Sequence, residues 1–274
     1  RYKELLMGAN RIDQKFRELK KARKKAFIAY ITAGDPDIST TEKLVPELEA
    51  RGVDIIELGV PFSDPLADGP IIQAASERAL KNNVNLGSIF SLVKRLRSKT
   101  NVPITLMTYY NPVFKFGLDR FAKMASAAGV DGVIIPDLPP EEAKALQAGC
   151  RANNIHVIFL LSPTSTAGRV RLIARQSRGF IYFVSLTGVT GERKNLPLEI
   201  RANVRRIKRC TKKPVCVGFG VSRPDQARAM AKISDGVIVG SAIIRAIEAN
   251  RKKSGFINRT GRFVSGLSRA VHNI

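Results

Sequence analysis

Eight short runs rich in β-branched and aromatic residues recur along the chain of 274 residues, and segments with helical periodicity separate most of them. Strands that alternate with helices over this length predict an α/β fold, a (β/α)8 TIM barrel that forms a single domain over residues 1–274. A doubly wound sheet is the alternative arrangement. The expected strands are 27–32, 53–59, 104–109, 132–136, 157–161, 180–185, 215–218 and 236–239.

Two further helices are expected in addition to this repeating unit. One is an extra N-terminal amphipathic helix near residues 12–24, and the other is a helix near residues 70–81 inserted after the second strand. The second insertion makes that strand-to-helix connection unusually long. Long insertions at the catalytic face of a barrel are often lids or partner contacts.

The chain is strongly basic, with a formal net charge of +23. Its Lys and Arg residues concentrate in residues 1–25, 201–213 and 251–262, where they alternate with apolar positions and few aromatic residues. We therefore expect solvated outer faces and no nucleic-acid partner. The excess of Lys and Arg is explained either by compositional bias or by a function, since a positive field would speed the arrival of a phosphorylated substrate.

No apolar run approaches the roughly 20 residues needed to cross a bilayer, so we expect no membrane partner. We expect a cytoplasmic protein, or one of an organellar stroma if a leader preceded Arg1.

Cysteine and histidine are scarce. Cys150, Cys210 and Cys216 lack metal-ligand spacing and are expected to be reduced. The two histidines, His156 and His272, are too few for a multi-histidine metal site, so no metal is expected. His156 opens an expected strand, which would put it at the stability end of the barrel, and His272 lies in what reads as a terminal tail. Acid–base chemistry then falls to carboxylates, tyrosine or lysine.

The segment 57–70 has the carboxylate pattern best suited to such chemistry. Glu57 is expected at the carboxyl end of a buried strand, where barrel ligands collect, and Asp64 and Asp68 follow in a loop restricted by proline and glycine. Two carboxyl groups held over one cavity can take different protonation states, one as acid and one as base.

Other polar and aromatic residues near strand ends have two interpretations each. Carboxylates at such positions are often helix caps or loop acceptors, and we assign that role to Asp35, Asp137 and Glu141. Hydroxyl groups or packing around an apolar ligand are the alternatives for Tyr109 and Tyr182. A further set is expected to form either apolar pocket lining or ordinary core: Tyr30, Ile134, Leu160 and Phe219.

Glycine-containing segments follow the last three expected strands, at 187–191, 218–222 and 240–241. Their backbone N–H groups, with a helix beginning at Ser241, predict a phosphate site in the usual barrel position. Tight turns without a ligand are the alternative.

The motifs that carry these residues resemble the tryptophan synthase alpha subunit family of indole-3-glycerol phosphate lyases over nearly the whole chain. The resemblance implies a (β/α)8 barrel that cleaves indole-3-glycerol phosphate to indole and glyceraldehyde 3-phosphate by a retro-aldol route, with no cofactor or metal in this chain. It also implies a beta-subunit partner that contains pyridoxal phosphate, in an alpha2beta2 complex. The matching segments are 30–36, 57–70, 109–112, 136–139, 187–191, 218–220 and 240–241.

The resemblance also implies roles for individual residues. The catalytic glutamate falls on Glu57 and the catalytic aspartate on Asp68, while the loop of Asp64 and the turn at Pro61 match positions that face the beta subunit. The implied indole pocket comprises Tyr30, Tyr109, Ile134, Leu160, Tyr182 and Phe219. The implied phosphate loops contain Gly191, Gly220, Gly240 and Ser241. Arg223 departs from the family pattern, where smaller polar residues are common, and either contacts phosphate or faces solvent.

The residue chemistry agrees with that implied reaction. Glu57 is suited to both proton steps, and Asp68 to an ionised role beside the ring nitrogen. Two other functions remain open at this point. One is a stand-alone lyase, and the other is a non-catalytic phosphate-binding interaction subunit, which would be expected to lack Glu57 or Asp68.

Overall fold

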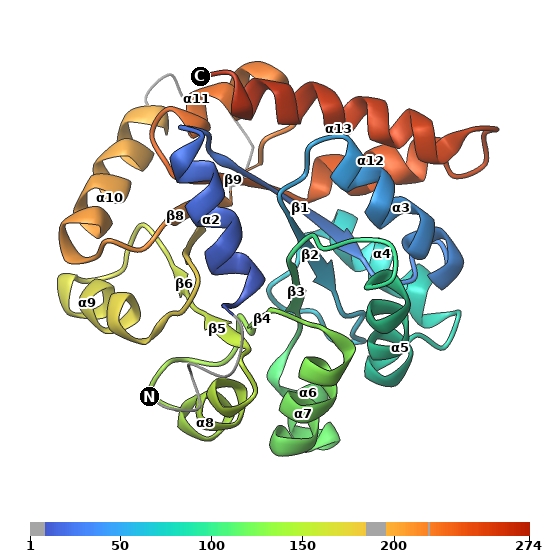
Figure 1. Cartoon of the computed structure of the whole chain (residues 1–274), viewed down its shortest axis with the longest axis horizontal. Helices are drawn as coiled ribbons and strands as arrows, with labels where there is room; N and C mark the ends of the chain where they lie inside the picture. Colours follow the sequence, from blue (N-terminus) through green and yellow to red (C-terminus); the bar gives the residue numbers. More distant parts are fainter. Residues whose placement is uncertain (1–8, 185–195, 219) are drawn as a thin grey trace.

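The computed structural model describes residues 9–184, 196–218 and 220–274 (Figure 1). Within them a parallel sheet of nine strands has the order β5-β4-β3-β2-β1-β9-β8-β7-β6. The strands are β1 (Ala26–Thr32), β2 (Ile55–Gly59), β3 (Ile104–Met107), β4 (Gly132–Ile134), β5 (His156–Ile158), β6 (Leu160–Leu161), β7 (Ile181–Val184), β8 (Val215–Gly218) and β9 (Gly236–Val239).

The two edges of this sheet are consecutive in the chain, because only Phe159 separates β5 from β6. The backbone N–H of Phe159 donates to the Ser177 hydroxyl at 2.8 Å instead of to a neighbouring strand. The single strand expected at 157–161 is therefore two short strands that pair on opposite sides. The sheet is a nearly closed barrel, which confirms the predicted fold class.

The helices surround the strands on the outside, except α2, which lies across one end of the barrel (Figure 1). They are α2 (Arg11–Lys21), α3 (Ile38–Ala50), α4 (Pro70–Leu80), α5 (Leu86–Leu96), α6 (Tyr110–Phe116), α7 (Leu118–Ala128), α8 (Lys144–Ala152), α9 (Ala167–Gln176), α10 (Leu196–Cys210), α11 (Pro224–Ala231), α12 (Ser241–Asn250) and α13 (Phe256–His272). The extra N-terminal helix and the helix inserted after the second strand are both present, as α2 and α4. None of the helices in the described part of the chain has the length and hydropathy of a membrane span.

Each strand is buried on both of its faces. In β1, Ala26 and Ile28 belong to the apolar cluster inside the barrel, whereas Phe27 and Ile31 belong to the cluster between the barrel and its helices. Successive side chains of a strand point to opposite faces, so the interior row of β1 continues at Tyr30. This double burial explains why the strand sequences read as nearly continuous apolar runs.

Helix α2 covers the N-terminal end of the barrel. Ile12 on this helix is fully buried in the interior cluster. The Asn10 side chain caps the helix through the Ile12 N–H and donates to the backbone carbonyls of Asp131 and Asn154. The buried carboxylate of Asp131 adds a second attachment, because it pairs with Arg11 at 2.8 Å and with Arg97 at 2.9 Å.

Two helices, α6 and α13, were not among the expected elements. The residues taken as a terminal tail form α13, which packs against α3, α11 and α12. Its end is fixed by His272, whose Nε2 lies 2.8 Å from Asp54. The strand expected at 104–109 ends at Met107, because Tyr109 is already the N-cap of α6.

Replacing Asp131 tests the attachment between α2 and the barrel. Asp131→Ala leaves the guanidinium of Arg97, whose pKa burial lowers to about 10, without its buried partner. Breaking a buried pair in this way costs about 3–5 kcal/mol. We expect a loss of this size in the free energy of unfolding, measured by urea denaturation at pH 7. The control is Glu142→Ala, which removes an exposed carboxylate and should leave stability nearly unchanged. Equal effects of the two substitutions would contradict the assigned role of Asp131.

Candidate active site

Glu57 is the third residue of β2, two residues before the end of the strand rather than at its last position. It lies opposite Tyr30 of β1 and Thr105 of β3 in the parallel register, on the interior face of the barrel. The side chain is fully buried, and neither carboxylate oxygen has a hydrogen-bond partner within the described residues. A buried carboxyl group with no partner inside a barrel is costly, so it is a strong candidate for a functional group.

The protonation of Glu57 follows from this environment. Burial, and then the negative charge of Asp68, raise its pKa to about 8. The group is therefore protonated in a large fraction of molecules at neutral pH. A carboxyl group with a pKa near the working pH can both give and take a proton.

Asp68 lies in the loop between β2 and α4 and is half-buried. Burial raises its pKa to about 6, and a hydrogen bond from the Tyr109 hydroxyl opposes that rise. Asp68 thus ionises at lower pH than Glu57. Between these two pKa values the Glu57 carboxyl is mostly protonated while the Asp68 carboxyl is mostly ionised.

Tyr109 fixes the loop that contains Asp68. Its hydroxyl accepts a hydrogen bond from the backbone N–H of Ala67 at 2.9 Å and donates to the Asp68 carboxylate. The ring packs against Phe62 of the same loop, with 5.3 Å between ring centroids. Tyr109 therefore acts on the loop through both its hydroxyl and its ring.

The expected pocket-lining residues lie inside the barrel where the structure describes them. Tyr30, Ile134 and Tyr182 are buried and Leu160 is partly buried, while Phe219 lies outside the described residues. Burial raises the pKa of Tyr182 well above its usual value, and the charge of Glu57 adds to this effect. Both the burial and the electrostatic coupling indicate that Tyr182 and Glu57 share the barrel interior.

Small residues at strand ends make room for these tyrosines. A Cβ at Gly59 would lie 2.2 Å from the Tyr30 hydroxyl oxygen, and a Cβ at Gly218 would lie 2.5 Å from the Tyr182 ring. Gly59 and Gly218 are therefore required by the neighbouring aromatic side chains and not only by turn geometry. The sequence signal for this role was the position of each glycine at the end of an expected strand.

The three carboxylates assigned to structural roles make structural contacts. Asp137 accepts from the backbone N–H of Tyr110 at 2.9 Å, at the start of α6, and Glu141 pairs with Arg169. Asp35 is instead a buried partner of Arg78, which donates to both of its oxygens at 2.7 and 2.8 Å. This bidentate pair ties α4 to the loop after β1, a contact that the sequence did not reveal.

The expected phosphate position is described in part. Gly240 follows β9, and Ser241 is the first residue of α12, so the positive end of that helix dipole lies at the carboxyl ends of the strands. Gly220 is exposed, and Gly191 lies outside the described residues. Arg223 contacts Asp225 through Nε at 3.1 Å and Nη2 at 3.0 Å. The described residues contain no group of three or more His, Cys, Asp or Glu side chains suited to a metal ion, and all three cysteines are free.

The fold and the site together define the class. This is a (β/α)8 barrel in which the second strand and the loop after it each contribute a carboxyl group of raised pKa, Glu57 and Asp68, at the end where barrel enzymes have their active sites.

Comparison with known proteins gives the family. The family model for the tryptophan synthase alpha chain matches residues 16–272. The tryptophan synthase alpha chain of Geobacter sulfurreducens is 52% identical over 265 residues, which cover 96% of this chain and all of the relative. That of Dehalococcoides mccartyi is 50% identical over 228 residues, 83% of this chain and 89% of the relative.

Solved structures agree with the sequence relatives. Tryptophan synthase subunit alpha from Legionella pneumophila superposes with a TM-score of 0.91 at 39% identity, covering 97% of this chain and all of that one. A Mycobacterium tuberculosis tryptophan synthase chain gives a TM-score of 0.88 at 36% identity, covering 96% and 99%. The chain belongs to the tryptophan synthase alpha chain family. This confirms the predicted enzyme class, a carbon–carbon lyase of tryptophan biosynthesis.

The buried state of Glu57 predicts an unusual dependence of stability on pH. The carboxyl pKa rises from 4.5 to about 8 on folding, so between these values the native protein holds a proton that the unfolded chain has lost. Stability from this group is complete below pH 4.5 and falls as the pH rises toward 8, by at most about 1.4 kcal/mol per pH unit.

Glu57→Gln removes that dependence, because the amide does not ionise. We expect the variant to match the wild type near pH 4.5 and to be more stable than the wild type at pH 9, as measured by urea unfolding across the range. Glu142→Gln, at an exposed position, serves as the control. Parallel stability curves for Glu57→Gln and the wild type would show that Glu57 does not hold its proton in the folded protein.

Proposed function

We propose that the chain cleaves indole-3-glycerol phosphate to indole and glyceraldehyde 3-phosphate by a retro-aldol mechanism, with Glu57 and Asp68 as its catalytic residues. The observation that carries this proposal is Glu57, which is fully buried, lacks a hydrogen-bond partner within the described residues and has a pKa raised to about 8. The assignment of the substrate rests on membership in the tryptophan synthase alpha chain family.

The reaction needs two proton transfers and one charge balance. The protonated carboxyl group of Glu57 gives its proton to C3 of the indole ring, which leaves a positive charge on the ring nitrogen. The Glu57 carboxylate then takes the proton of the C3′ hydroxyl as the bond between C3 and C3′ breaks and the aldehyde forms. Glu57 ends in its starting state, and a pKa near neutrality suits a group that must act in both directions.

Asp68 supplies the negative charge that the indolenine nitrogen requires. Its pKa of about 6 leaves it largely ionised at neutral pH while Glu57 remains protonated. The hydrogen bond from Tyr109 holds Asp68 in one position, so little reorganisation is needed when the charge develops.

Binding energy comes from groups remote from the broken bond. We infer that the indole ring lies among Tyr30, Tyr109, Ile134, Leu160, Tyr182 and Phe219. We infer that the phosphate is bound by Gly191, Gly220, Gly240 and Ser241. These contacts orient the substrate over Glu57 without taking part in the proton transfers.

A beta subunit is the expected partner, in an alpha2beta2 complex in which the partner contains the pyridoxal phosphate. The loop after β2 supports this assignment, because the Leu66 side chain is 94% exposed between Asp64 and Asp68. An exposed leucine beside a catalytic loop suits a surface that another chain covers. We place this complex in the cytoplasm. A stand-alone lyase is the second candidate, since Tyr109 already holds the loop through Ala67 and Asp68.

An indole-release assay on the purified chain separates these functions. Measured with and without a beta subunit, release that rises strongly with the partner supports the synthase subunit. Release that is already maximal without a partner supports the stand-alone lyase. Absence of release in both conditions would leave only a non-catalytic phosphate-binding subunit.

Glu57→Gln tests the proton transfers directly. The amide keeps the size of the side chain but exchanges no proton, and a general acid–base group is typically worth about 10²–10⁴-fold in rate. We expect at least this loss in the turnover number, with substrate binding retained, in the indole-release assay. Turnover within about threefold of the wild type would remove Glu57 from the mechanism.

Asp68→Asn tests the charge balance. We expect a loss of about 10²-fold or more in turnover with a smaller change in affinity, because a neutral amide does not stabilise a positive ring nitrogen. The matched control is Asp64→Asn, an exposed carboxylate in the same loop, assayed on the chain without a partner. If saturating substrate restored the rate of Asp68→Asn, the residue would serve binding instead.

A further inference from the structure

A cavity of about 610 Å³ lies at the N-terminal end of the barrel, beside α2 and opposite the catalytic carboxylates. Its 14 lining residues include seven Lys or Arg side chains and a single carboxylate, Asp13. The basic residues are Arg17, Lys20, Arg151, Arg175, Arg178, Lys212 and Lys213. The catalytic mechanism uses none of them.

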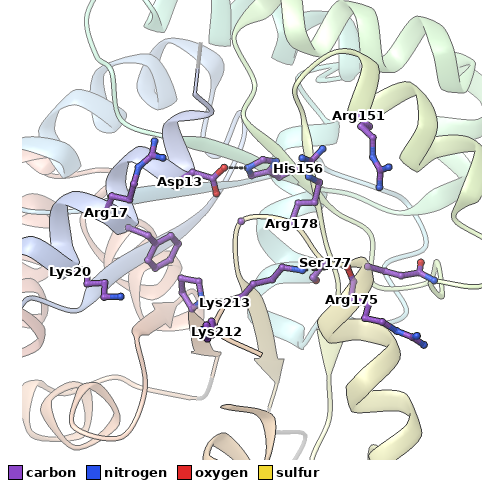
Figure 2. Close-up of a pocket in the computed structure, with 14 residues that line it drawn as sticks. Asp13, Arg17, Lys20, Arg151, His156, Arg175, Ser177, Arg178, Lys212 and Lys213 are labelled. Atoms are coloured by element: carbon purple, nitrogen blue, oxygen red, sulfur yellow. Dashed lines mark hydrogen bonds and ion pairs between the residues drawn. The ribbon is translucent and has the colours of Figure 1, made fainter. Parts of the chain in front are cut away.

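These basic side chains come from four separate parts of the chain. Figure 2 shows Arg17 and Lys20 of α2 on one side of the cavity and Arg151 and Arg175 on the other. Lys212, from the loop between α10 and β8, lies between these two sides, below Arg17 and Lys20 in this view. Convergence from separate elements brings together charges that repel one another, which favours an anion bound between them.

Most of the basic side chains of this cavity form no ion pair within the described residues, although Arg17 and Arg178 lie near enough to Asp13 to lower the pKa of that carboxyl. No ion pair is formed there by Arg17, Lys20, Arg151, Arg175 or Lys212, in contrast to the surface pairs of Glu42 with Arg95 and Lys99. Burial, and then the nearby charge of Arg178, lower the pKa of the Lys213 ammonium. That ammonium donates to the Ala174 carbonyl at 2.7 Å, at the end of α9, and forms no ion pair with a carboxylate of the described residues.

The one carboxylate of the cavity is already engaged. Asp13 lies 2.8 Å from Nε2 of His156, the first residue of β5. The His156 ring is 95% buried, and its Nδ1 has no hydrogen-bond partner within the described residues. The wall of the cavity therefore contains a buried imidazole whose Nε2 is bonded to Asp13 and whose Nδ1 is unsatisfied among the described residues.

We propose that this cavity, hereafter the basic cavity, binds a small anion with a chain of condensed phosphates, of the nucleoside triphosphate or inorganic polyphosphate class. A volume of about 610 Å³ lies in the range of small-molecule sites. A single phosphate contacts only a few donors at once, whereas a phosphate chain reaches charges from several elements together. Phe16 and Pro214 add apolar surface that a nucleobase would cover.

A nucleic acid fits the basic cavity less well. Proteins that bind single strands without sequence preference use an extended positive groove with several stacking aromatic residues. Here the charges surround one concavity, and Phe16 is the one aromatic side chain in its lining apart from His156. Binding of an oligonucleotide is therefore a contrary outcome of the test.

The two histidines of the chain make the test specific, because they give two imidazole signals in NMR spectra. His156 lines the basic cavity, and His272 pairs with Asp54 at the end of α13. The protein is titrated with ATP, and separately with tripolyphosphate, at about 150 mM salt and with saturating glycerol 3-phosphate present to occupy the proposed phosphate site. We expect the His156 signal to shift saturably and the His272 signal to stay in place. ATP binding more tightly than tripolyphosphate would identify a nucleotide, and the reverse order an inorganic chain.

A pair of charge-matched variants locates the site. Lys20→Ala/Arg175→Ala/Lys212→Ala removes three exposed charges of the basic cavity, and Lys252→Ala/Lys253→Ala/Arg262→Ala removes three exposed charges from the region of α12 and α13. We expect the first variant to weaken triphosphate binding at least about tenfold, which is 1.4 kcal/mol, and the second less than about twofold. Both should keep the wild-type rate of indole release, because neither alters the proposed catalytic site.

Three results would overturn the proposal. They are the absence of a saturable His156 shift with both ligands, equal losses in the two variants, and tighter binding of a single-stranded RNA oligonucleotide than of either triphosphate. The proposed lyase activity is tested separately, because loss of indole release with triphosphate binding intact would contradict only that function.

Discussion

Closure of the parallel sheet is the constraint on which the rest of the structure depends. The chain passes from one edge of the sheet to the other at Phe159, because β5 pairs with β4 and β6 pairs with β7. Each strand then has one face toward a common interior and one toward the helices. Side chains inside the barrel then have no route to bulk water except at its two ends. This isolation gives Glu57 its raised pKa, because a carboxylate there loses hydration that no described group replaces.

Two carboxyl groups toward the carboxyl end of the barrel have different pKa values because their environments differ. Glu57 is on a rigid strand and fully buried, whereas Asp68 is on a loop and half-buried, with the Tyr109 hydroxyl as a hydrogen-bond donor. A change in loop position would alter the burial of Asp68 and its charge effect on Glu57 together. The position of the loop therefore affects the protonation of both carboxyl groups, and a partner that packs on Leu66 would change both pKa values through the loop.

The sequence predicted the barrel well because its strands are buried on both faces and appear as apolar, β-branched runs. It predicted Glu57 and Asp68 as candidates because carboxylates next to such runs are unusual. It failed where tertiary contacts decide the outcome. Helix α13 contains Gly261 and Gly266, which weaken its helical signal, and its place depends on packing against α3, α11 and α12. The bidentate contact of Asp35 with Arg78 joins residues 43 positions apart, which no local pattern reveals.

The location of the basic residues also depends on tertiary structure that the sequence pattern does not reveal. Sequence periodicity assigned them to solvated outer faces, which is a statement about each helix alone. Arg17 of α2, Arg175 of α9 and Lys212 before β8 nevertheless meet at one cavity, because the N-terminal ends of the strands bring their flanking segments together. The barrel thus places two carboxyl groups of raised pKa toward one end and a cluster of basic side chains at the other. Charges of like sign gathered at one place repel, so a chain that keeps several of them there gains stability from any anion that binds among them.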